Sequence, residues 1–248
     1  MTGLPLLLMI CLVALVYASV GHGGASGYLA VLAACTTIPS AQMSTTALIL
    51  NVLVAGAAWQ AFWRAGHGSL DLLWPFLLGS VPCALLGGSL RVSSRVYDGL
   101  LAFTLACAAV RLLLSAGSSS PPTAVRPPRR ATALLIGGAI GAVSGIVGVG
   151  GGIFLSPLMI LRRWADPKQA AAASACFIVL NSAAGLLGRG LVGLLDGRVA
   201  LPFVGAAVAG GVLGSRLGAG RLSHPALRRI LAGVLLIAIA KRVMPWWS

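Results

Sequence analysis

Two glycine-rich motifs are the part of this 248-residue sequence whose residue types could do chemistry. The second motif, GIVGVGGGIFLSPL, runs from Gly145 to Leu158, and the first, GHGG, occupies residues 21–24. Because glycine lowers the cost of leaving helical backbone angles, a glycine run inside an apolar segment predicts a broken helix. A break exposes backbone N–H groups and the positive end of a helix, which can bind an anion. Close helix packing through small residues is the alternative interpretation.

Neither motif fits a nucleotide-binding loop. A P-loop needs Gly-Lys-Ser or Gly-Lys-Thr after its glycines, and a dinucleotide-binding turn needs a preceding strand and an acidic residue about 20 positions later. The sequence supplies none of these. We therefore expect the two motifs to offer a substrate their backbone at Gly21, Gly23, Gly24, Gly148, Gly150, Gly151 and Gly152.

Four polar side chains within apolar segments are further candidates for substrate contact. They form two pairs, Ser44 with Asn51 and Ser174 with Asn181, and each pair is separated by seven residues. This spacing places the serine and the asparagine on one face of a helix, two turns apart. Contact with the substrate and hydrogen bonding between helices are equally compatible with the pattern.

His22 and two arginines are the charged or ionisable candidates. An ionisable group inside a membrane suggests a function, and imidazole titrates in the range that suits proton coupling. A hydrogen bond from His22 to a carbonyl beside the glycine turn would explain it equally well. Arg189 and Arg216 lie at segment ends, so we expect interfacial loop cations, with attraction or binding of the anion as the alternative.

The elements that must position these residues are membrane helices. Hydrophobic residues make up 58% of the chain and 33 more residues are glycine, whereas a soluble domain is roughly 45–50% apolar with glycine included. Eighteen Lys and Arg residues stand against four Asp, a net charge of +14. The cations lie between long apolar runs, which indicates loops beside membrane spans rather than a surface for nucleic acid. We predict an all-α, multi-pass membrane protein.

The uncharged stretches predict about eight transmembrane helices in two repeated halves. Two of these helices are expected to break at the glycine motifs, which allows up to ten passes. The halves are residues 1–114 and 131–248, and a Pro/Arg-rich linker at residues 115–130 joins them. The glycine motifs recur with an offset of 127 positions, and LWPF at residues 73–76 and ALPF at residues 200–203 keep the same offset. Such duplication is typical of secondary transporters.

The distribution of cations predicts how the halves are oriented. If the glycine breaks turn the chain back, the Lys and Arg residues divide twelve to six between the two sides of the membrane. This asymmetry follows the positive-inside rule. Each half then makes five passes, so we expect inverted halves, a cytoplasmic linker and both termini outside. The last predicted span, around residues 226–245, is the weakest.

The pattern GxxGxGGGxxxxP, with its degenerate first copy, resembles the TauE/SafE-type sulfite exporter family, also called the toluene sulfonate uptake permease family. The pattern falls on Gly145, Gly148, Gly150–Gly152 and Pro157, whereas in the first copy His22 interrupts the glycines and Ala25 replaces the third. The resemblance implies an inner-membrane transporter, with export favoured, of small sulfur-containing or carboxylated organic anions such as sulfite or sulfoacetate.

Two other functions are weighed against anion transport. A cation or metal transporter should place acidic, histidine or cysteine clusters inside its spans, but the chain has no Glu and its aspartates lie near segment ends. An intramembrane Ser/His hydrolase needs a nucleophile within reach of a base, and only His22 could serve Ser26 or Ser144. We therefore expect no enzyme activity, no cofactor and no metal, with an anion and the lipid bilayer as partners, no nucleic acid, and a homo-oligomer as an open possibility.

Overall fold

The computed structural model describes residues 3–114, 127–194 and 196–220, and the secondary structure of these residues is entirely helical. The first group of helices is α1 (Leu4–Ala18), α2 (Ala25–Cys35), α3 (Ser40–Arg64), α4 (Leu70–Ser89) and α5 (Ser94–Leu114). The second group is α6 (Arg130–Val147), α7 (Gly152–Leu161), α8 (Pro167–Leu191), the 3₁₀ turn η1 (Arg198–Ala200) and α9 (Leu201–Ala219). The prediction of an all-α polytopic protein is confirmed.

Five helices in the described part of the chain are long and apolar enough to cross a membrane. They are α3, α4, α6, α8 and η1 with α9, and three shorter apolar helices, α1, α2 and α7, accompany them. Their ends follow local rules: Asp166 caps the N-terminus of α8 with its side chain, and Gln169 completes a capping box. The predicted span at residues 226–245 lies outside the described residues, so the total number of spans stays a prediction.

Both glycine motifs interrupt helices as expected. The first interruption separates α1 from α2, with positive φ angles at Gly21 and Gly24. The second separates α6 from α7, with positive φ at Gly148, Gly150 and Gly151. These angles lie in the left-handed region that side chains with a Cβ rarely adopt. We call residues 19–24 the first break and residues 148–151 the second break.

Glycine also lets two pairs of helices pack backbone against backbone. Three glycines of α6 lie so close to α4 that an added Cβ atom would overlap a backbone carbonyl oxygen there. The pairs are Gly137 with Phe76, Gly141 with Ser80 and Gly145 with Ala84. In α9, a Cβ at Gly210, Gly214 or Gly218 would overlap the carbonyl oxygen of Cys11, Leu15 or Ser19. Contacts advance by four residues along both partners, so α4 runs parallel to α6 and α1 runs parallel to α9. Each pair joins helices from different halves of the chain.

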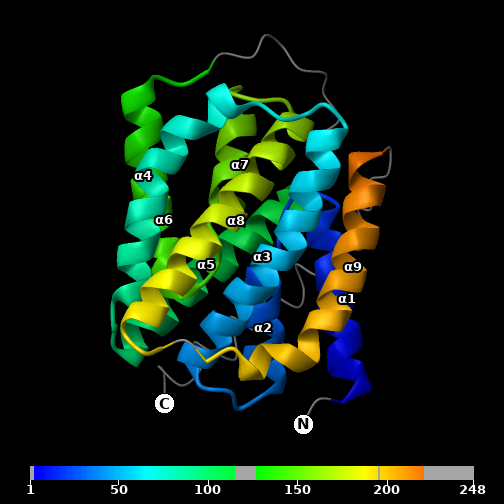
Figure 1. Cartoon of the computed structure of the whole chain (residues 1–248), viewed down its shortest axis with the longest axis vertical. Coiled ribbons are helices and arrows are strands. Elements are labelled where there is room, and N and C mark those ends of the chain that lie inside the picture. The colour runs from blue at the N-terminus through cyan, green and yellow to red at the C-terminus, as the bar shows by residue number, and fades with distance from the viewer. Residues whose placement is uncertain (1–2, 115–126, 195, 221–248) are drawn as a thin grey trace.

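The two parallel helix pairs are compatible with the predicted repeat, because each pair joins one helix from each half. In Figure 1, α1 rises from the end of the bundle marked N, whereas α6 starts at the opposite end. In each half a long helix of 25 residues, α3 or α8, follows the broken pair. The inverted repeat and the domain boundaries of residues 1–114, 115–130 and 131–248 stay predictions.

Candidate functional site: the meeting point of two broken helices

Asn51 of α3 joins the two breaks. Its Oδ1 accepts a hydrogen bond from the N–H of Ala25, the first residue of α2, at 3.1 Å. Its Nδ2 donates to the carbonyl oxygen of Val149 in the second break at 3.1 Å and to Ser182 Oγ at 3.3 Å. One fully buried amide thus holds the start of α2, the second break and α8 together.

His22 links the breaks a second time. Its Nε2 lies 3.0 Å from the carbonyl oxygen of Gly152 and 3.1 Å from Ser156 Oγ in α7, and its Nδ1 lies 2.8 Å from the carbonyl oxygen of Val20. A neutral imidazole carries one N–H and an imidazolium carries two. A neutral ring can therefore donate to only one of the two carbonyl oxygens, and Ser156 can donate to Nε2 when that nitrogen is the acceptor.

The predicted site glycines lie at points of close approach between these elements. A Cβ at Gly23 or Gly150 would overlap the side-chain amide of Asn51, and a Cβ at Gly148 would lie 2.9 Å from the carbonyl oxygen of Ser44. The remaining four pack on other neighbours: Gly21 on Ala171, Gly24 on Tyr28, Gly151 on Ile140 and Phe177, and Gly152 on Ile178. A side chain at any of these positions would therefore displace a neighbouring element.

Backbone donors gather at the same place. Helices α2 and α7 both start there, at Ala25 and Gly152. Within the described part of the chain, the N–H groups of Gly150, Gly151, Gly152 and Ile153 donate to no backbone carbonyl. The first N–H groups of a helix carry the positive end of its dipole. The meeting point therefore offers two positive helix ends within the protein interior.

The four polar candidates divide between two places. Ser44 Oγ donates to the carbonyl oxygen of Val147 at the end of α6 and lies 2.8 Å from Tyr97 OH. Ser174 is fully buried, its backbone carbonyl adjoins Gly152, and its hydroxyl has no partner among the described residues. Asn181 instead donates to Ser80 Oγ of α4 and to the carbonyl oxygen of Phe177. The structure thus places Ser44, Asn51 and Ser174 beside the breaks and turns Asn181 toward α4.

Sequence reasoning missed three hydroxyl groups at the breaks. Tyr28 is fully buried, its hydroxyl lies over Gly24 at the start of α2, and this hydroxyl has no hydrogen-bond partner in the described structure. Ser156 and Ser182 contact His22 and Asn51. The position of Ser156 just before Pro157, inside the second motif, was the available signal for this residue.

One interpretation of the arginines is wrong. Arg189 is not a loop cation: it lies inside α8, is only 4% exposed, and donates through Nη2 to the carbonyl oxygens of Gly145 at 3.3 Å and Ile146 at 2.9 Å. The sequence placed Arg189 at the end of an uncharged segment, whereas the helix continues past it to Leu191. Arg216 is exposed in the last turn of α9, as an interfacial cation should be.

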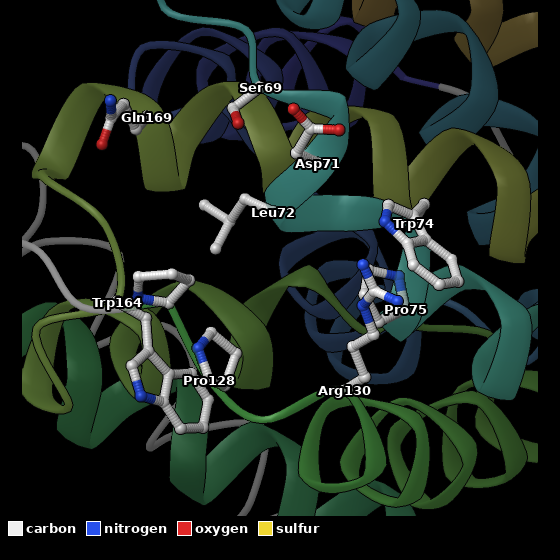
Figure 2. A pocket seen from close by; sticks show the side chains of 10 residues that line it. Ser69, Asp71, Leu72, Trp74, Pro75, Pro128, Arg130, Trp164 and Gln169 are labelled. Carbon is white, nitrogen blue, oxygen red and sulfur yellow. The ribbon is translucent and has the colours of Figure 1, made fainter.

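A cavity of about 420 Å³ lies at the end of the bundle where α6 begins, which we call the linker end because Pro127 and Pro128 line the cavity. Figure 2 shows Trp74, Arg130 and Trp164 around it, and the Arg130 guanidinium lies 5.2 Å from the centre of the Trp74 ring. None of the predicted site residues lines this cavity. It therefore does not coincide with the meeting point of the breaks.

Comparison with known proteins decides the family. The profile of the family described as Sulfite exporter TauE/SafE matches residues 6–242. The chain belongs to this family. It is also 36% identical over 233 residues to "Probable membrane transporter protein y4hK" of Sinorhizobium fredii (strain NBRC 101917 / NGR234), an alignment that covers 91% of this chain and 92% of that protein. No solved structure matches the chain significantly.

The TauE/SafE assignment makes the protein a multi-pass membrane transporter. The family and the relative are both described as transporters rather than enzymes. Among the described residues, no group of three or more His, Cys, Asp or Glu side chains could hold a metal ion. The five cysteines are free, and Cys176 is buried in α8 as a small apolar side chain would be.

Proposed function

We propose that this TauE/SafE transporter exports a small sulfur-containing or carboxylated organic anion through a site where its two breaks meet. The observation that carries the proposal is the convergence of two helix starts, Ala25 of α2 and Gly152 of α7, on Asn51 and His22. Backbone N–H groups at such helix starts favour negative charge.

The side chains around the meeting point suit an anion. The hydroxyls of Tyr28 and Ser174 are buried without a hydrogen-bond partner in the described structure, and each can donate to an oxyanion. Among the described residues, the hydrogen bonds of Asn51 and the close neighbours of the site glycines include none of the four aspartates. Hydrogen-bond donors stabilise a bound anion, and a carboxylate among these contacts would repel it.

Direction and substrate class rest on the family. Its description names sulfite export, and the meeting point provides donors that a sulfite, sulfonate or carboxylate group could accept in the same way. A cation or metal transporter is the weaker candidate, because oxygen or sulfur ligands of negative charge would be needed at the site.

Flux measurement in proteoliposomes tests the proposal. The full chain is reconstituted, and uptake and release of radiolabelled sulfite, sulfoacetate and acetate are followed with a proton gradient of either sign. We expect saturable flux of at least one of these anions, inhibited by the others, and no flux of labelled Zn²⁺. Cation flux without anion flux would overturn the proposal.

A further inference from the structure

Arg189 places a positive charge inside the bundle next to the second break. Its guanidinium contacts the carbonyl oxygens of Gly145 and Ile146, in the last turn of α6 before Gly148. Ser44 donates to the next carbonyl oxygen, that of Val147, and lies 2.8 Å from Tyr97 OH. Arg189 and Ser44 together therefore occupy the three carbonyl groups that precede the break.

The positive charge of Arg189 is stabilised by the C-terminal ends of helices and not by a carboxylate. The hydrogen bonds of its guanidinium among the described residues go to backbone carbonyls, Tyr97 lies close enough to interact with its charge, and its Nε is buried without a hydrogen-bond partner there. All four aspartates of the chain, Asp71, Asp98, Asp166 and Asp196, lie in the described part, and none forms one of these contacts. The C-terminal ends of α6 and α8 carry partial negative charge, which keeps a guanidinium charged. A carboxylate would have cancelled its attraction for an anion.

A buried arginine without an acidic partner is costly in a membrane protein and commonly marks an ion pathway. The guanidinium group has five N–H donors in a planar fork that matches an oxyanion. Arg189 uses Nη2 for the α6 carbonyls and has its Nε unused. Its place near the end of α8 puts it on the side of the meeting point away from the linker end (Figure 1).

We propose that Arg189 is a second binding position for the transported oxyanion, between the meeting point of the breaks and the end of the bundle opposite the linker. This inference rests on the proposed function. The anion binds the free edge of the guanidinium while Nη2 stays on the α6 carbonyls. Arg189 thus supplies a full positive charge, whereas the helix starts at the meeting point supply partial charges.

Substitution of Arg189 in the full chain tests the inference. In proteoliposomes, Arg189→Gln should raise the half-saturating concentration of labelled sulfite by about tenfold or more, because a charge-assisted contact is lost. Arg189→Lys keeps the charge but loses the fork, so we expect a smaller, several-fold increase. Arg216→Gln, which removes an exposed arginine at the end of α9, is the matched control and should saturate like the wild type.

A structural role for Arg189 would give a different result. The melting temperature of each purified variant is measured with and without sulfite. If Arg189 only holds the carbonyl groups at the end of α6, its loss lowers the melting temperature without sulfite but leaves the sulfite-induced rise in melting temperature intact. We expect Arg189→Lys to keep the melting temperature without sulfite and to show a smaller sulfite-induced rise than the wild type. If the Gln variant does not fold, the Lys variant carries the test. Wild-type saturation and an intact rise in the Lys variant would overturn the inference, whereas absence of anion flux in the wild type would overturn the proposed function instead.

Discussion

The Nε2 atom of His22 lies 3.0 Å from the carbonyl oxygen of Gly152, although 130 residues separate the two in the chain. This contact ties the first break to the start of α7. Asn51 makes the corresponding tie from the start of α2 to the second break. The breaks are therefore connected through two side chains.

Gly150→Ala should abolish transport. Gly150 has a φ of +75°, and an added Cβ would overlap Asn51 Nδ2 and lie 2.9 Å from Ser182 Oγ. The left-handed angle alone costs a residue with a Cβ about 1–2 kcal/mol, and the overlap would displace the Asn51 bridge. The measurement is sulfite flux per reconstituted protein, alongside the yield of folded protein in detergent.

Gly56→Ala is the matched control for this substitution. Gly56 lies within α3, five residues after Asn51, and an added Cβ would meet no atom within 4 Å. We expect unchanged flux and a gain of up to about 1 kcal/mol in stability, because alanine is the better helix former. Normal flux in Gly150→Ala would show that the close approach at the second break is dispensable.

Asn51→Ala should impair transport more than Asn181→Ala. The first variant leaves the N–H of Ala25 and the carbonyl of Val149 without their partner, and each buried unsatisfied group costs about 1–3 kcal/mol. The second variant breaks contacts with Ser80 and with the backbone of α8 itself. Half-saturating concentrations and maximal rates for both variants decide between them. An equal rise in half-saturation would place Asn181 at the substrate as well, as the sequence predicts.

His22→Gln should remove the pH dependence of transport. A protonated His22 satisfies both surrounding carbonyl oxygens and adds a positive charge beside the anion, so wild-type flux should fall as the pH rises and the ring loses its proton. Glutamine keeps a hydrogen-bonding group of similar size but does not titrate in this range. Flux is measured from pH 5 to pH 8.5 with equal pH on both sides of the membrane.

His67→Gln is the control for the pH experiment. His67 lies in the connection between α3 and α4, and its ring packs on Phe62. Its replacement should leave the pH profile as in the wild type. If flux in His22→Gln depends on pH as it does in the wild type, His22 has a purely structural role. Any proton coupling would then involve the substrate itself.

The sequence was sufficient to predict the features of the fold that depend on local composition. Apolar runs predicted the helices, and the glycine runs predicted the interruptions between α1 and α2 and between α6 and α7. Which face of a helix meets which neighbour depends on tertiary packing, so the pattern could not separate Asn51, at the breaks, from Asn181, against α4. The sequence pattern placed Arg189 in a loop because a charged residue indicates the end of a membrane span. The carbonyl groups at the end of α6 that accept hydrogen bonds from it are 43 and 44 residues away in the sequence, so no local pattern could reveal them.

The predicted inversion of the two halves can be tested by cysteine labelling. Gly3 immediately precedes α1, and Pro127 lies just before α6. Because α1 and α6 are the first helices of the two halves, inverted halves place these residues on opposite sides of the membrane. Gly3→Cys and Pro127→Cys are introduced separately into a chain whose five native cysteines are replaced by alanine, and an impermeant maleimide is applied to intact cells.

We expect Gly3→Cys to react in intact cells and Pro127→Cys to react only after the membrane is permeabilised. The end of the bundle near Pro127 also carries Arg64, Arg129, Arg130, Arg162 and Arg163, and cations favour the cytoplasmic side. Labelling of both cysteines from the same side would exclude the inverted arrangement. Reaction of Pro127→Cys alone in intact cells would keep the inversion but reverse the orientation, which would place Arg189 on the cytoplasmic side of the meeting point.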